Sequence, residues 1–178
     1  MKQLVAANVV RIIVSSLTLA AGVTMTSAPS WADAWRLQKY PKDKFQVEWS
    51  GPVRIEVTEL PSSTQKLVDH AAAYMQDEPA AYSVGVALGL PSSKTSLQGY
   101  AEATFKKYEC NQIDKKSIVL KNTEAVEWIG ANCREGWRVR ARIFHKGNWL
   151  YGVFAVVDSD GDVDAAQHFL ESFKIIED

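Results

Sequence analysis

The stretch from Trp137 to Ile175 constrains the fold more than any other part of the chain. Residues 137–145 alternate, so one strand face is largely apolar and the other is rich in arginine. The first face holds Trp137, Val139, Ala141, Ile143 and His145, and the second holds Arg138, Arg140, Arg142 and Phe144. Residues 149–157 are apolar on both faces, which is typical of a central strand. We therefore expect a hairpin that turns at residues 146–148, where Gly147 and Asn148 tolerate positive φ.

A helix is expected directly after this hairpin. The acidic segment 158–164 ends the second strand, and Asp162 or Asp164 can cap a helix and complement its dipole. Apolar residues then recur at helical spacing, at Val163, Ala166, Phe169, Leu170 and Phe173. Because the hairpin and the helix are close in sequence, we expect them to pack together.

Residues 1–32 are typical of a signal peptide rather than of folded structure. Lys2 and Arg11 supply positive charge, residues 12–23 are apolar or small, and cleavage is expected after Ala32. Residues 33–178 would then form a single domain. It keeps 18 of the 20 basic residues against 21 acidic ones, a formal charge of −3, which argues against nucleic-acid binding. No second apolar run is long enough to span a membrane.

Both cysteines, Cys110 and Cys133, lie in the exported part of the chain. Export places them in an oxidising compartment, so we expect a disulfide. The alternative is a catalytic or metal-binding thiol, but the chain has no C-x-x-C and no histidine at ligand spacing.

The rest of the chain predicts mostly strands joined by short turns. Alternating residues indicate two paired strands at 45–49 and 53–57, and further strands at 82–88, 118–120 and 125–131. Helical spacing indicates an amphipathic helix over 97–108. Residues 64–75 fit either a helix or the partner strand of 82–88, and we favour the strand. The fold class is therefore α+β, with a predominantly antiparallel sheet of six to eight strands flanked by two amphipathic helices.

The end of the chain resembles small exported bacterial proteins and, more distantly, the PsbP-like domains of photosynthetic membranes. The resemblance is carried by the segment WLYGVFAVV, the acidic break and the segment HFLESFKI, which is similar to the closing F-L-x-S-F-K helix of those families. It implies an α/β/α sandwich around an antiparallel sheet. PsbP itself is an accessory protein that helps retain ions at a larger complex. No functional residue of that family can be matched here.

Arginines are the first candidate binding residues. Arg138, Arg140 and Arg142 project from one strand face, and Arg54 projects from another strand. Guanidinium groups suit carboxylates and phosphates, so these residues could hold a small anionic ligand or an envelope protein. The alternative is a solvated face in which Glu48, Glu56 and Glu127 act as cross-strand partners.

Acidic residues are the second candidate site. Asp158, Asp160 and Asp162, with Asp164 beyond them, could bind Ca²⁺, which prefers several oxygen ligands. The spacing departs from the EF-hand pattern, because Gly161 stands at the fourth position and Phe169 at the twelfth. The alternative is a turn followed by a helix cap.

The sequence contains no recognisable catalytic motif. His70, His145 and His168 lie on different predicted elements, and no nucleophile elbow, phosphate-binding loop or zinc-protease motif is present. We therefore expect no cofactor, and an exported, periplasmic or secreted protein that acts as a non-catalytic binding or accessory domain of the cell envelope. The alternatives are an envelope hydrolase and a calcium-binding accessory protein.

Overall fold

The computed structural model describes residues 35–58, 68–77, 80–89, 102, 105–106, 108–120, 122–158 and 161–177. Within these ranges the chain forms strands, two 3-10 turns and one α-helix. The elements are β1 (Arg36–Tyr40), η2 (Pro41–Asp43), β2 (Phe45–Trp49), β3 (Arg54–Val57), β4 (His70–Gln76), β5 (Ala81–Leu88), β6 (Gln112–Leu120), β7 (Thr123–Ala131), η3 (Arg134–Gly136), β8 (Arg138–Lys146), β9 (Trp149–Val157), α4 (Val163–Ser172) and β10 (Lys174–Ile175).

The predicted C-terminal hairpin and helix are confirmed. β8 pairs antiparallel with β9: Arg138 lies opposite Val157 at one end, and Lys146 lies opposite Trp149 at the other. Gly147, in the turn between them, has a φ of +57°. β9 lies between β5 and β8, and every residue after Trp149 is buried, as expected for a central strand. α4 begins after Asp162, whose side chain accepts a hydrogen bond of 2.8 Å from the backbone N–H of Ala165.

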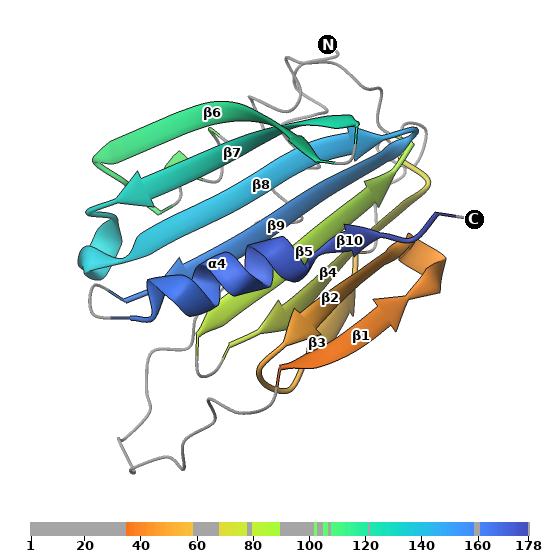
Figure 1. The fold of residues 1–178 in the computed structure, drawn as a ribbon, viewed down its shortest axis with the longest axis horizontal. Coiled ribbons are helices and arrows are strands. Elements are labelled where there is room, and N and C mark those ends of the chain that lie inside the picture. The colour runs from red at the N-terminus through yellow and green to blue at the C-terminus, as the bar shows by residue number, and fades with distance from the viewer. Residues whose placement is uncertain are drawn as a thin grey trace.

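The described strands form two antiparallel sheets. The larger sheet has the order β3-β4-β5-β9-β8-β7-β6, and the smaller has the order β1-β2-β10. Figure 1 shows the small sheet and α4 beside each other over one face of the large sheet. Their apolar side chains, including Trp49, Phe169 and Leu170, share one buried cluster with Tyr151 and Val153 of β9. This layer positions the C-terminal end of α4 over β8 and β9.

The opposite face of the large sheet carries a second buried cluster. Phe105 and Tyr108 pack there against Trp128, Ala141 and other residues of the central strands. Of the helix expected over 97–108, residues 102, 105 and 106 are helical and residue 108 lies in a turn; the other residues of that range lie outside the described residues. Where we expected two helices around one sheet of six to eight strands, the described residues define one complete helix and two sheets, of three and seven strands.

The expected pairing of residues 45–49 with 53–57 is wrong. β2 pairs with β1 and β10, whereas β3 pairs with β4 at the edge of the large sheet.

A buried glutamine explains how the chain crosses between the sheets. The Oε1 atom of Gln76 accepts hydrogen bonds of 3.1 and 2.9 Å from the backbone N–H groups of Ser50 and Gly51, and its Nε2 atom donates to the Ser50 hydroxyl at 2.9 Å. The turn between β2 and β3 is therefore stabilised by a side chain of β4, about 25 residues further along the chain.

The strand interpretation of residues 64–75 is confirmed where the structure describes it. β4 pairs along its whole length with β5, with His70 opposite Leu88 at one end and Gln76 opposite Tyr82 at the other. Residues 59–67 lie outside the described residues.

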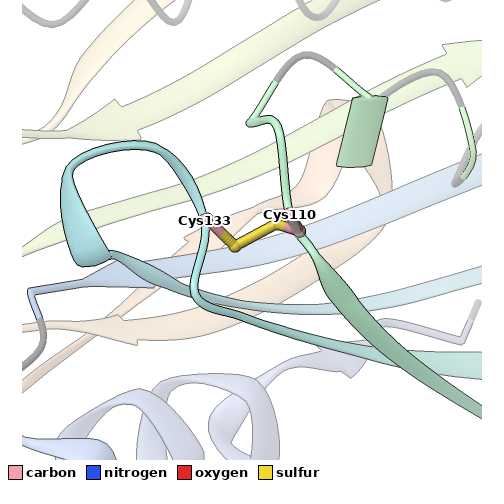
Figure 2. Close-up of a disulfide and its surroundings, with 2 residues drawn as sticks. All are labelled: Cys110 and Cys133. Atoms are coloured by element: carbon pink, nitrogen blue, oxygen red, sulfur yellow. A yellow bond between two sulfur atoms is a disulfide. The ribbon is translucent and has the colours of Figure 1, made fainter.

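The predicted disulfide joins Cys110 to Cys133. Cys110 precedes β6 and Cys133 follows β7, so the bond closes the open end of the β6–β7 hairpin, as Figure 2 shows. Gly130 lies directly beneath it, because a Cβ atom there would be 2.7 Å from the Cys110 sulfur. Cys110 directly follows the turn at Tyr108 and Glu109.

Candidate binding groove and its charged wall

Two of the predicted binding arginines surround one buried carboxylate. Arg142 and Arg140 project from β8 toward Glu127 of β7, which is only 3% exposed. The Nε atom of Arg142 lies 2.7 Å from one carboxylate oxygen, and the Nη2 atom of Arg140 lies 3.6 Å from the other. Lys116 approaches the same carboxylate at 3.9 Å. Glu127 is therefore a cross-strand partner of these arginines, as the alternative interpretation expected, but the cluster is buried and is not the solvated face of that interpretation.

Arg142 also connects the sheet to α4. Its Nη1 atom donates a hydrogen bond of 3.1 Å to the backbone carbonyl of Leu170, in the last turn of the helix. The last turn of α4 contains no basic residue of its own. Arg142 therefore supplies, from the sheet, the positive charge that a helix C-terminus favours.

The remaining arginines lie apart from this cluster. Arg138 is exposed at the start of β8. Arg54 lies on β3, at the opposite edge of the large sheet, where it pairs with Glu56 and with Asp77 at 3.2 Å. The four predicted arginines therefore do not converge on a single site.

The acidic segment begins the helix. The side chain of Asp162 caps α4, Asp158 is exposed, and Asp160 lies outside the described residues. Within the described ranges no group of three or more histidine, cysteine, aspartate or glutamate side chains is placed to hold a metal ion. Calcium binding by this segment stays a prediction.

A groove opens where α4 ends, beside Arg142. Its volume is about 240 Å³, and its floor is formed by Phe144 of β8 and Val153 of β9. One wall is the end of the β6–β7 hairpin, and the other is the end of α4 with β10 and the tail. The remaining lining residues are Val119, Leu120, Thr123, Arg142, Lys146, Leu170, Glu171, Phe173, Lys174, Ile175 and Glu177. The apolar floor and the charged rim give the groove the usual character of a ligand site.

Sequence reasoning did not find this groove. Its walls come from segments around residues 120, 144 and 173, which only the sheet topology brings together. The alternation of β8 was the one available signal, because it places Arg142, Phe144 and Lys146 on the same face.

A second polar cluster lies under the β1–β2 turn. The carboxylate of Asp43, only 1% exposed, accepts a hydrogen bond from the hydroxyl of Tyr74, and its Oδ1 atom lies 2.9 Å from Nε2 of His70. The hydroxyl of Tyr151 donates to the backbone carbonyl of Asp43 at 3.2 Å. Burial, and then the hydrogen bond to Asp43, raise the pKa of Tyr74 above its usual range. This cluster fixes the small sheet to β4 and β9.

The other histidines occupy separate positions. His168 of α4 lies 2.7 Å from the carboxylate of Glu48 and packs against the ring of Trp35, with centroids 4.6 Å apart. Burial lowers the pKa of His145, and a hydrogen bond with the backbone of Trp149 acts in the opposite direction. None of the three histidines lines the groove.

Comparison with known proteins supports the fold. No protein-family model and no curated protein matches the chain. Among solved structures, the solution structure of cyanobacterial PsbP (CyanoP) from Synechocystis sp. PCC 6803 is similar, with a TM-score of 0.50 and 12% sequence identity. The similarity covers 87% of this chain and 98% of that chain. The chain therefore has a PsbP-like α+β fold, and the predicted resemblance is confirmed at the level of fold. No helix within the described residues is long and apolar enough to cross a membrane.

Proposed function

We propose that this protein is an exported, non-catalytic binding domain of the cell envelope, and that the groove beside the C-terminal end of α4 is its binding surface. The groove is the observation that carries the proposal. It combines buried apolar residues, Phe144, Val153 and Leu170, with charged side chains at the rim. Pockets of this composition bind ligands by burying apolar surface and orienting them with a few polar groups.

The rigidity of the surrounding structure supports a preformed site. Arg142 holds the sheet to the last turn of α4 through Glu127 and the Leu170 carbonyl. The Cys110–Cys133 disulfide closes the far end of the β6–β7 hairpin, whose turn forms the other wall. Walls fixed in this way reduce the conformational entropy lost when a ligand binds.

Export is supported by two independent features. The N-terminal segment has the charge and apolar pattern of a signal peptide. The disulfide is of a kind that persists in oxidising compartments such as the periplasm or the extracellular space.

The proposal is tested by thermal unfolding of the oxidised protein in the presence of a protein-free small-molecule extract of its own cell envelope. Saturation of the groove should raise Tm by about 5–10 °C, since a ligand at a hundredfold excess over Kd stabilises by about 2.7 kcal/mol. Leu120→Trp places a large ring in the groove wall and should abolish the shift. The matched control is Ile113→Trp, on the same strand at a position 43% exposed and outside the lining, which should retain the shift.

Two outcomes would contradict the proposal. The first is an unchanged Tm for the wild-type protein across the extract fractions. The second is an equal shift in Leu120→Trp, which would place the binding elsewhere. A shift produced by millimolar calcium alone would instead favour the accessory role of Asp158, Asp160 and Asp162.

A further inference from the structure

We infer that β6 pairs antiparallel with β6 of a second copy of this chain, across a two-fold axis at Lys116. The inference goes beyond the proposed function and does not depend on it. β6 is one edge of the large sheet, and β7 is its one strand neighbour among the described residues (Figure 1). It is nine residues long, whereas β3, at the other edge, has four. A long edge strand presents more unpaired backbone groups to another strand.

Four residues of β6 direct their backbone hydrogen-bonding groups away from the sheet. β6 and β7 are joined by only two residues, and Leu120 pairs with Thr123 across this connection. The pair that closes a two-residue hairpin exchanges hydrogen bonds, and the residues of an antiparallel strand then alternate. Every second residue before Leu120 therefore bonds to β7, and the residues between them point their N–H and C=O groups outward. These outward-facing residues are Ile113, Lys115, Ser117 and Val119.

The lysines of β6 leave this edge accessible. Lysine on an edge strand usually discourages pairing with another strand. Here the Nζ atom of Lys115 lies 5.5 Å from the ring centroid of Trp128, and the Nζ atom of Lys116 lies 3.9 Å from the carboxylate of Glu127. Both partners belong to β7. Both lysine side chains therefore lean back over the sheet, away from the outer side of β6.

The side chains of β6 favour a second copy over an unrelated strand. Ile113 and Val119 are 43% and 71% exposed, and each lies three residues from Lys116. A two-fold axis at Lys116 therefore places Ile113 of each copy opposite Val119 of the other, so both apolar side chains gain a partner. The same axis pairs all four outward-facing residues of each strand, whereas an axis at any other residue leaves at least one of them unpaired.

The charges on the other face of the strand also fit this axis. The axis places the two Lys116 side chains opposite each other, and like charges in that position repel. Asp114 lies two residues away on the same face, so it is a neighbour of its own Lys116 and diagonal to Lys116 of the other copy. Two aspartates thus accompany the two lysines, and the charge around the axis is balanced.

The test is sedimentation equilibrium of the full-length protein, expressed with its own N-terminal segment and purified oxidised from the envelope. One paired strand buries less area than the roughly 1,200–2,000 Å² of a stable interface, so we expect a reversible dimer that dissociates at micromolar concentration. Between about 1 and 500 μM, the mean mass should therefore rise from that of one chain toward that of two.

Two variants locate the dimer at the β6 edge. Ser117→Pro removes an outward N–H group and leaves the hydrogen bonds to β7 in place, so it should stay monomeric with an unchanged circular dichroism spectrum. Its matched control, Ser117→Ala, keeps the backbone group and should dimerise like the wild-type protein. Val119→Lys changes a side chain that is 71% exposed, so the fold is retained, and it should weaken the dimer at least tenfold.

A cysteine at position 116 tests the axis. Facing residues of a non-hydrogen-bonded pair have Cα atoms about 4.5 Å apart, within the range that a disulfide spans. Lys116→Cys should therefore form a covalent dimer under mild oxidation, detected by intact mass. Ser117→Cys should not, because in this register it lies opposite Lys115 of the other copy.

Each contrary result overturns a stated part of the inference. A single-chain mass at every concentration would overturn the pairing of two copies and leave this edge for a strand of another protein. A dimer that folded Ser117→Pro or Val119→Lys retains at wild-type affinity would overturn the assignment to β6. Failure of Lys116→Cys to cross-link would overturn the axis at Lys116.

Discussion

Removal of the disulfide is the most informative perturbation of the fold. In the variant Cys110→Ser/Cys133→Ser the β6–β7 hairpin loses the bond that closes its open end. The two cysteines are 23 residues apart. For a loop of this length, the chain-entropy relation gives a loss of about 3 kcal/mol in the free energy of unfolding at 25 °C. For a domain of this size, that corresponds to a fall in Tm of roughly 6–12 °C.

The assay is urea unfolding followed by circular dichroism, on the wild-type protein with and without reductant and on the double variant. The reduced wild-type protein and the variant should unfold at the same lower urea concentration. Hydrogen exchange should then show the added opening in β6, which is an edge strand paired only with β7 in the described sheet. A stability loss below about 1 kcal/mol, or uniform exchange across both sheets, would refute the reasoning.

Four further predictions follow from single sites. Glu127→Gln should cost about 3 kcal/mol in urea unfolding, because it removes a buried charge that two arginines contact; a loss below 1 kcal/mol would contradict this. Gly130→Ala should cost about 1–3 kcal/mol by overpacking against the disulfide, and an unchanged midpoint would disagree. Burial raises the pKa of Tyr82, with the charge of Asp162 as a second cause, and of Tyr108, each to about 12. The folded state therefore holds protons that the unfolded state releases near pH 10, so stability should fall between pH 10 and 12 in urea titrations, less steeply in Tyr108→Phe; a flat profile would contradict this. N-terminal sequencing of the exported protein should begin at residue 33, and a retained Met1 would refute processing.

The predictable part of the fold is the part whose determinants are local. The β8–β9 hairpin and α4 depend on alternation, on a glycine in the turn and on a cap by Asp162, and each of these signals lies within the element it specifies. The disulfide was predictable because export and a cysteine count of two leave one intramolecular pairing.

The division into two sheets was not predictable, because its determinants are distant in sequence. β1 has an exposed pattern resembling a polar lead-in, and β10 is only two residues long. The turn between β2 and β3 depends on the side chain of Gln76, about 25 residues further along. No local pattern distinguishes this glutamine from an exposed one.

The arginines of β8 show the same contrast between what local sequence determines and what distant parts of the chain determine. The alternation correctly placed Arg140 and Arg142 on one face, but their shared partner Glu127 and the contact with Leu170 depend on strand order and helix position. The same face continues to Phe144 and forms the groove floor, which only the packed structure shows.

Native mass spectrometry of the protein isolated gently from its own cell envelope tests the central claim most directly. A binding domain with a preformed groove should carry a small non-covalent ligand, visible as an added mass on the wild-type protein and on Ile113→Trp but not on Leu120→Trp. A bare mass for the wild-type protein, or an added mass that persists in Leu120→Trp, would contradict the account.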